Sequence, residues 1–175
     1  QDDADGDGAG DLCDPCPGDA ADLCEVAGSD AVEVYPPSSG LLTVSDGRLT
    51  LDLPGSALSS PETVSATRSA EHNEIVPIEP SGPQGPGRII DKYQMSPDGL
   101  SFASPGTLTL RADVTGLSGS GLAELGVYQR VGEQYVLVGD ACSVNESPPG
   151  VFTASCSASI DGFSEYALIT GAPFV

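Results

Sequence analysis

The chain has 175 residues, of which 39% are hydrophobic, enough for one ordinary domain with a small extension. Its 26 acidic residues outnumber its 6 lysines and arginines and give a formal net charge of -20. Such a charge repels the phosphates of nucleic acids and anionic membrane surfaces, so we expect the protein to bind neither. No stretch approaches the roughly 18 apolar residues of a membrane span, so we also expect no membrane insertion.

The first thirty residues concentrate the negative charge, with ten Asp and Glu and no Lys or Arg. Starting at Asp3, carboxylates fall at positions 1, 3, 5, 9 and 12 of a twelve-residue segment, and Gly8 stands at position 6, where the chain must turn sharply. Such a loop winds around calcium and takes its position-7 ligand from a backbone carbonyl, here that of Ala9. Because carboxylates so close together repel one another, the pattern predicts a calcium site rather than a solvated tail.

Residues 3–14, followed by Pro15, Cys16 and Pro17, resemble the thrombospondin type-3 repeat, whose signature is Asp-x-Asp-x-Asp-Gly-x-x-Asp-x-Cys-Asp-x-Cys-Pro. The resemblance covers about the first 25 residues. It implies a segment without a hydrophobic core that is held by ions and disulfides. It also implies five side-chain calcium ligands and one backbone ligand, namely Asp3, Asp5, Asp7, Asp11, Asp14 and Ala9.

A shortened second unit follows at residues 18–24, without its own Asp-x-Asp-x-Asp-Gly run. Two interpretations of its aspartates stay open: Asp19 and Asp22 complete a second ion site with the first loop, or they are solvated. We expect the chain, which starts with neither Met nor a signal peptide, to be a mature or excised piece of a longer product.

The five cysteines lack His partners, which favours disulfides over zinc and points to an oxidising compartment. Cys16 and Cys24 enclose a short loop and are the favoured local pair. Cys13 is then left for an upstream repeat or another chain, although a different pairing among these three stays open. Cys142 and Cys156 flank a connection at 145–150, which predicts a disulfide across a hairpin, worth about 3 kcal/mol.

From about residue 31 the sequence consists of short alternating runs separated by Gly, Pro, Ser and Asp. Residues 48–53 and 107–112 alternate with period two, as half-buried strands do, and no segment keeps a helical period over about ten residues. The pattern predicts an all-β fold, an antiparallel β-sandwich of about ten short strands. The expected strands are 31–35, 41–44, 48–53, 63–68, 88–95, 107–114, 122–130, 134–138, 151–157 and 163–170.

Three short segments, at 40–58, 96–110 and 162–168, resemble the ZU domain of zonula occludens, ankyrins and netrin receptors and related bacterial surface modules. The first has a Gly-rich entry and two short strands before Pro54, although Ser56 interrupts the family's Gly-Ala-Leu triplet. The resemblance implies a ZU-like β-sandwich over residues 37–175. Residues 26–36 are then a linker and first strand, and residues 1–25 the calcium-binding repeat.

Some relatives of this family cut themselves between Phe and Ser of a His-Phe-Ser motif, where the His assists proton transfer. Gly162 stands in that His position here, so we expect no cleavage between Phe163 and Ser164. Phe163 and Tyr166 are expected as core and edge residues of a final strand. His72, the single histidine, is expected in an exposed loop, and no zinc or Ser-His-Asp set is present, so the sequence predicts no enzyme.

These features predict a calcium-binding structural or adhesive module of a secreted or cell-surface protein, in which calcium rigidifies the N-terminal repeat next to the sandwich. The expected partners are calcium ions and other protein domains or neighbouring copies. Two alternatives stay open. One is a subunit of a calcium-dependent, self-assembling filament or layer, suggested by the leftover cysteine and the apolar tail at 172–175. The other is a glycan-binding accessory module.

Overall fold

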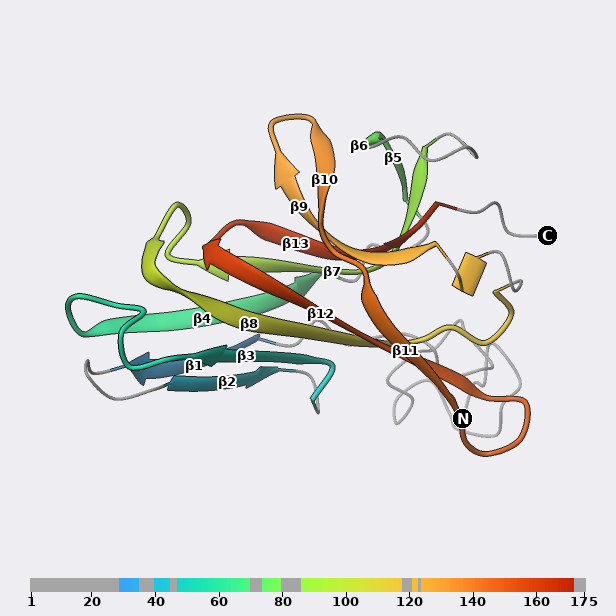
Figure 1. Cartoon of the computed structure of the whole chain (residues 1–175), viewed down its shortest axis with the longest axis horizontal. Helices are drawn as coiled ribbons and strands as arrows, with labels where there is room; N and C mark the ends of the chain where they lie inside the picture. The colour runs from blue at the N-terminus through green and yellow to red at the C-terminus, as the bar shows by residue number, and fades with distance from the viewer. Residues whose placement is uncertain are drawn as a thin grey trace, which may run out of the picture.

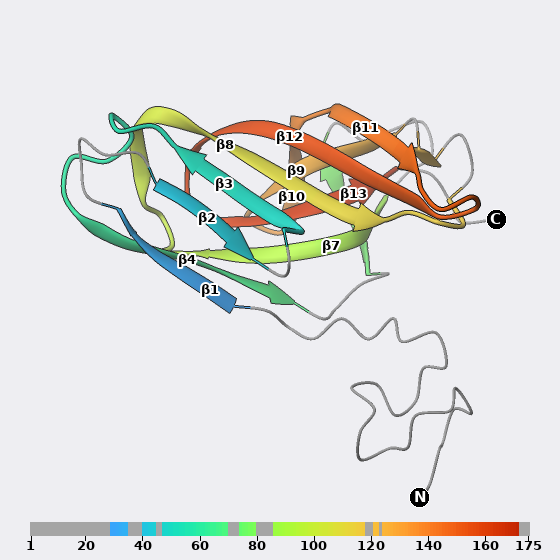
Figure 2. The ribbon, with the colours of Figure 1, turned by 90° about the horizontal axis from the view of Figure 1, so that it is seen from below.

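The computed structural model describes residues 29–34, 40–44, 47–69, 74–79, 86–117, 121–122 and 124–171. In these residues two β-sheets face each other, and the predicted β-sandwich is confirmed (Figures 1 and 2). The strands are β1 Ser29–Val34, β2 Gly40–Val44, β3 Leu49–Leu53, β4 Glu62–Ser69, β5 Ile75–Val76, β6 Ile78–Glu79, β7 Gly87–Ser96, β8 Ser101–Asp113, β9 Leu125–Val131, β10 Gln134–Gly139, β11 Ala141–Glu146, β12 Phe152–Gly162 and β13 Glu165–Thr170.

The larger sheet has the strand order β1-β4-β7-β13-β9-β10-β6, with β5 also paired to β7, and the smaller sheet has the order β11-β12-β8-β3-β2. Neighbouring strands are antiparallel, as predicted, except for the short β10–β6 pair, which is parallel. The sequence prediction missed β5, β6 and β11. β5 and β6 have two residues each, too few for a period-two pattern, and β11 is exposed at every position except Cys142, so it shows no alternation.

The main core lies between the two sheets and is built by alternate residues of each strand. In β3 and in the second half of β8, residues 106–113, every second residue is buried against the opposite sheet, and the intervening positions are Thr and charged residues. The edge strands β1 and β2 of the two sheets lie side by side (Figure 2). The main-core residues include Leu49, Leu51, Leu53, Val64, Ala66, Tyr93, Met95, Leu108, Leu110, Cys156, Tyr166 and Leu168.

The larger sheet curls into a closed ring at one end. β5 pairs with the start of β7, and β6 pairs with β10. Because only Pro77 separates β5 from β6, this segment links the two ends of the row β7-β13-β9-β10. The five parts together enclose a space. Gly87 faces this space, since a Cβ there would lie 2.5 Å from Cγ2 of Ile169. A second apolar cluster fills the ring: Val76, Ile78, Ile89, Tyr128, Tyr135, Ala167 and Ile169.

A buried ion pair joins β4 to β7. Nε of Arg68 lies 2.8 Å from Oδ1 of Asp91, and both side chains are almost fully buried. The hydroxyl of Tyr93 donates to Oδ2 of Asp91 at 2.9 Å, and the backbone N–H of Lys92 donates to Oδ1 at 3.0 Å. Burial and the neighbouring Asp91 raise the pKa of Tyr93, so the phenol stays protonated and can donate. The carboxylate thus has a charged partner and two further donors.

Asp91→Asn should lower the free energy of unfolding by about 3–5 kcal/mol, because it leaves the Arg68 charge buried without its carboxylate. Urea denaturation followed by circular dichroism measures the change. Asp52→Asn, at an exposed position of β3, removes the same charge and should change stability by no more than about 0.5 kcal/mol. Equal losses in the two variants would show that net charge, and not the buried pair, sets the effect.

Candidate functional site

The predicted calcium ligands and the cysteines near them fall outside the described residues, as does His72. Within the described ranges, no group of three or more His, Cys, Asp or Glu side chains is placed to hold a metal ion. The calcium site therefore stays a prediction from the sequence. The residues concerned are Asp3, Asp5, Asp7, Ala9, Asp11, Asp14, Asp19, Asp22, Cys13, Cys16 and Cys24.

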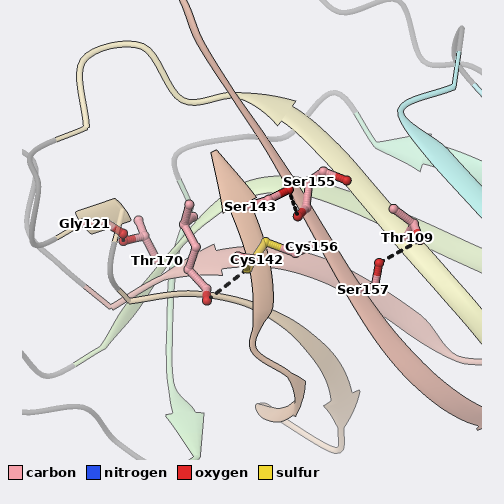
Figure 3. The surroundings of a disulfide bond; sticks show 9 residues. Thr109, Gly121, Cys142, Ser143, Ser155, Cys156, Ser157 and Thr170 are labelled. Carbon is pink, nitrogen blue, oxygen red and sulfur yellow. Dashed lines mark hydrogen bonds between the residues drawn. A yellow bond between two sulfur atoms is a disulfide. The ribbon is translucent and has the colours of Figure 1, made fainter. Parts of the chain in front are cut away.

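Cys142 and Cys156 form a disulfide, as predicted, between directly paired positions of β11 and β12 (Figure 3). Cys156 is fully buried in the main core. Sγ of Cys142 lies 3.3 Å from the carbonyl oxygen of Leu125 on the opposite sheet; this is a packing contact, because a disulfide sulfur has no proton to donate. The bond therefore fastens the exposed edge strand β11 to the core.

The segment Gly162-Phe163-Ser164 connects β12 to β13 and is held by backbone hydrogen bonds. The N–H of Phe163 donates to the carbonyl of Leu100 at 2.7 Å, and the carbonyl of Phe163 accepts from Gly99 at 3.1 Å. The Ser164 hydroxyl donates to the carbonyl of Arg130 at 3.2 Å. Because a backbone carbonyl does not take up a proton at neutral pH, this bond orients the hydroxyl without activating it as a nucleophile.

Gly162 leaves no room for the histidine of the self-cleaving relatives. A Cβ at this position would lie 2.6 Å from the carbonyl oxygen of Leu100, which is backbone and cannot swing aside. That same carbonyl accepts the hydrogen bond from Phe163. The local backbone is therefore built around a residue without a side chain.

Phe163 is buried as predicted, and its ring packs edge-on against Phe102 with 5.0 Å between the ring centroids. The expectation that Tyr166 lies at an edge is wrong. It is fully buried, because β13 lies in the middle of the larger sheet, between β7 and β9. The Tyr166 hydroxyl donates to the carbonyl of Gly162 at 2.6 Å, and burial, with a smaller contribution from Asp161, raises the pKa of Tyr166.

Two adjoining pockets open beside this segment, with volumes of about 350 and 290 Å³. Gln129 of β9 and Asp161 of β12 line both of them, so the pockets form one groove between the two sheets. We call it the Gln129–Asp161 groove. Its other lining residues are Pro105, Val138, Ser159 and Ile160 in the larger pocket, and Gly99, Leu100, Ser101, Phe102, Gly162 and Phe163 in the smaller one.

The groove lies where the smaller sheet opens. Pairing between β12 and β8 jumps from Ile160↔Gly106 to Gly162↔Ser101, which leaves Asp161 at an irregular position. Opposite it β8 turns away from β12, and the N–H of Ala103 donates instead to the carbonyl of Ala57 at 2.8 Å. Such irregularities redirect side chains and are common next to functional sites.

Neither Gln129 nor Asp161 was predicted as a site residue from the sequence. A signal for Gln129 was present, since it continues the register of the buried residues Leu125 and Val127 in β9 with a polar side chain. Nothing comparable marks Asp161, because the irregular pairing that exposes it depends on Ser101 and Gly106 of β8, which lie much earlier in the chain.

Models of known protein families do not match this chain, and no curated protein matches it either. The described part of the chain contains no helix that is long and apolar enough to cross a membrane.

The chain should remain intact at the Phe163–Ser164 bond, because the Ser164 hydroxyl donates to a backbone carbonyl and Gly162 leaves no space for a histidine. Intact-protein mass spectrometry after several days at neutral pH and room temperature is expected to show a single species. Ser164→Ala is the matched control and should give the same result. Two fragments divided at Ser164 in the unsubstituted protein alone would contradict this account.

Stability should fall at alkaline pH. Burial raises the pKa of Tyr93, Tyr135 and Tyr166, so above about pH 10 these tyrosines ionise in the unfolded chain but not in the folded one. Their contribution is complete below that pH and is lost as the pH rises, with a slope of about 1.4 kcal/mol per pH unit for each tyrosine. Urea denaturation between about pH 8 and pH 11 measures the slope, which Tyr166→Phe should reduce. A pH-independent midpoint would contradict the prediction.

Proposed function

We propose that the protein is an extracellular, calcium-binding, non-enzymatic module with a structural or adhesive role. The observation that carries this proposal is the twelve-residue register that starts at Asp3, in which five carboxylates and Gly8 occupy the positions of a calcium loop. The likeness to a thrombospondin type-3 repeat followed by a ZU-like sandwich is part of the proposal.

The position of β1 supports a mechanical role for calcium. β1 follows the acidic segment in the chain and pairs with β4 along its whole length, from Ser29↔Thr67 to Val34↔Glu62. The acidic segment therefore precedes an edge strand of the larger sheet. If calcium orders that segment, the ion fixes the direction in which the preceding chain leaves the sandwich.

An oxidising, extracellular location is supported by the Cys142–Cys156 disulfide, because such bonds persist mainly in secreted and surface proteins. The non-enzymatic role is supported by the state of Ser164, whose hydroxyl donates to a backbone carbonyl, and by the lack of space for a histidine at Gly162. The charge of -20 would also draw calcium towards the protein.

Calcium should bind with a dissociation constant on the order of 0.1–1 mM, the range of extracellular modules, when measured by isothermal titration calorimetry. Asp7→Asn removes one carboxylate from the proposed loop and should weaken binding about tenfold or more. Asp98→Asn, in the exposed turn between β7 and β8, should leave the binding constant within about twofold.

Limited proteolysis in EDTA should cut the first 28 residues and leave the sandwich intact, because carboxylate repulsion opposes a compact loop without the ion. Mass spectrometry locates the cuts, and excess calcium should suppress them. If calorimetry shows no binding heat and calcium leaves the cleavage pattern unchanged, the calcium proposal is contradicted. Loss of both parts at once in EDTA would instead show that the sandwich is not a separate unit.

A further inference from the structure

The Gln129–Asp161 groove contains polar groups that the protein itself does not use. Gln129 is half-buried and Asp161 is exposed, and both line the two pockets. Among the described residues, neither side chain has a hydrogen-bonding or ion-pair partner. One carboxylate and one amide oxygen are therefore free to accept hydrogen bonds from a ligand.

All six lysines and arginines lie among the described residues, and none of them lines either pocket. Arg130, the closest of them to Gln129 along the chain, donates to the carbonyl of Gly132 and lies 3.7 Å from Glu165. Within the described part of the chain, Asp161 thus has no cationic side chain in its pocket and can pair with the positive charge of a ligand.

The wall of the groove offers a free strand edge. β12 continues to Gly162, but its pairing with β11 ends at Ser157. Gly139 at the end of β10 packs against Ser157 and Ala158, since a Cβ at Gly139 would lie 2.6 Å from the carbonyl oxygen of Ser157. Among the described residues, 159–162 therefore have no paired strand on the β11 side. The larger pocket lies along this stretch, between Ser159–Asp161 and Val138 of β10. An uncovered edge of this kind can accept the backbone of an extended peptide.

The walls beside the carboxylate are apolar and match a methylene chain. Val138 and Ile160 line the larger pocket, and Phe102 lines the smaller one. A lysine side chain combines a four-carbon stem, which packs on such walls, with an ammonium group that needs several acceptors. Arginine fits less well, because its planar fork is best satisfied by paired carboxylate or phosphate oxygens.

We propose that the Gln129–Asp161 groove binds an extended basic segment of a partner protein. The backbone of that segment adds to the free edge of β12, and a lysine ammonium reaches Asp161 and the amide oxygen of Gln129. The negative field of the whole chain steers such a segment to the groove. This inference goes beyond the calcium-stiffened module and does not rest on calcium binding.

The test uses the full chain, labelled with ¹⁵N, and the peptide acetyl-Gly-Ser-Lys-Ser-Gly-amide, in parallel with and without calcium. The lysine peptide should shift the side-chain amide of Gln129 and the backbone amides of 159–162 in both conditions. A peptide with norleucine in place of lysine keeps the stem without the charge and should bind about three to ten times more weakly.

Two variants separate a built site from general attraction to an acidic protein. Asp161→Asn should weaken binding of the lysine peptide about three- to tenfold, and Glu133→Gln, in the exposed turn between β9 and β10, should change it less than about twofold. Unchanged resonances elsewhere in the spectrum of Asp161→Asn verify that this variant folds.

Several outcomes would overturn the proposal. Equal binding of the norleucine peptide would show that charge is not recognised. Equal weakening by the two variants, or shifts spread over acidic surfaces, would show that no specific site exists. Shifts at the groove with neutral oligosaccharides but not with the lysine peptide would assign it to glycans instead. The protein can bind the lysine peptide without binding calcium, and it can bind calcium without binding the peptide. The two proposals can therefore fail independently.

Discussion

The middle strands of the larger sheet must bury side chains on both of their faces, and the rest of the sandwich depends on this constraint. In β13, Tyr166 and Leu168 enter the core between the sheets, whereas Ala167 and Ile169 fill the ring closed by β5 and β6. A shift of one residue would exchange the two sets, placing Tyr166 where Ala167 fits. The two cores together therefore fix the register of β13 against β7 and β9.

This fixed register also determines the geometry of the candidate site. With Tyr166 held in the core, its hydroxyl reaches back to the carbonyl of Gly162 and sets the path of the connection from β12. The absence of a side chain at Gly162 lets that connection pass against Leu100. β12 and β8 then lose their pairing around Asp161, and the groove opens there. A packing requirement in the core thus produces an accessible polar site at the surface.

The sequence predicts those parts of the fold that follow from local alternation. Strands such as β3 and β8 show this alternation because one face is buried and the other is exposed to solvent. The Cys142–Cys156 disulfide was predicted from the position of the two cysteines in a hairpin. The two-residue strands β5 and β6 and their parallel contact with β10 depend on distant partners, so no local pattern marks them. For the same reason Tyr166 was expected at an edge, since chain order does not reveal that β13 inserts between β7 and β9.

The distribution of charge connects the sandwich with the acidic segment. Three of the six lysines and arginines bind other groups of the sandwich: Arg68 binds Asp91, Lys92 lies 3.2 Å from Glu74, and Arg111 donates to the carbonyl of Gly47. With only 6 lysines and arginines in the whole chain, few positive groups remain to balance the ten acids of the first thirty residues. Counter-charge for a cluster of that density would then come from its surroundings, and the divalent ion that we propose would supply it in the smallest volume.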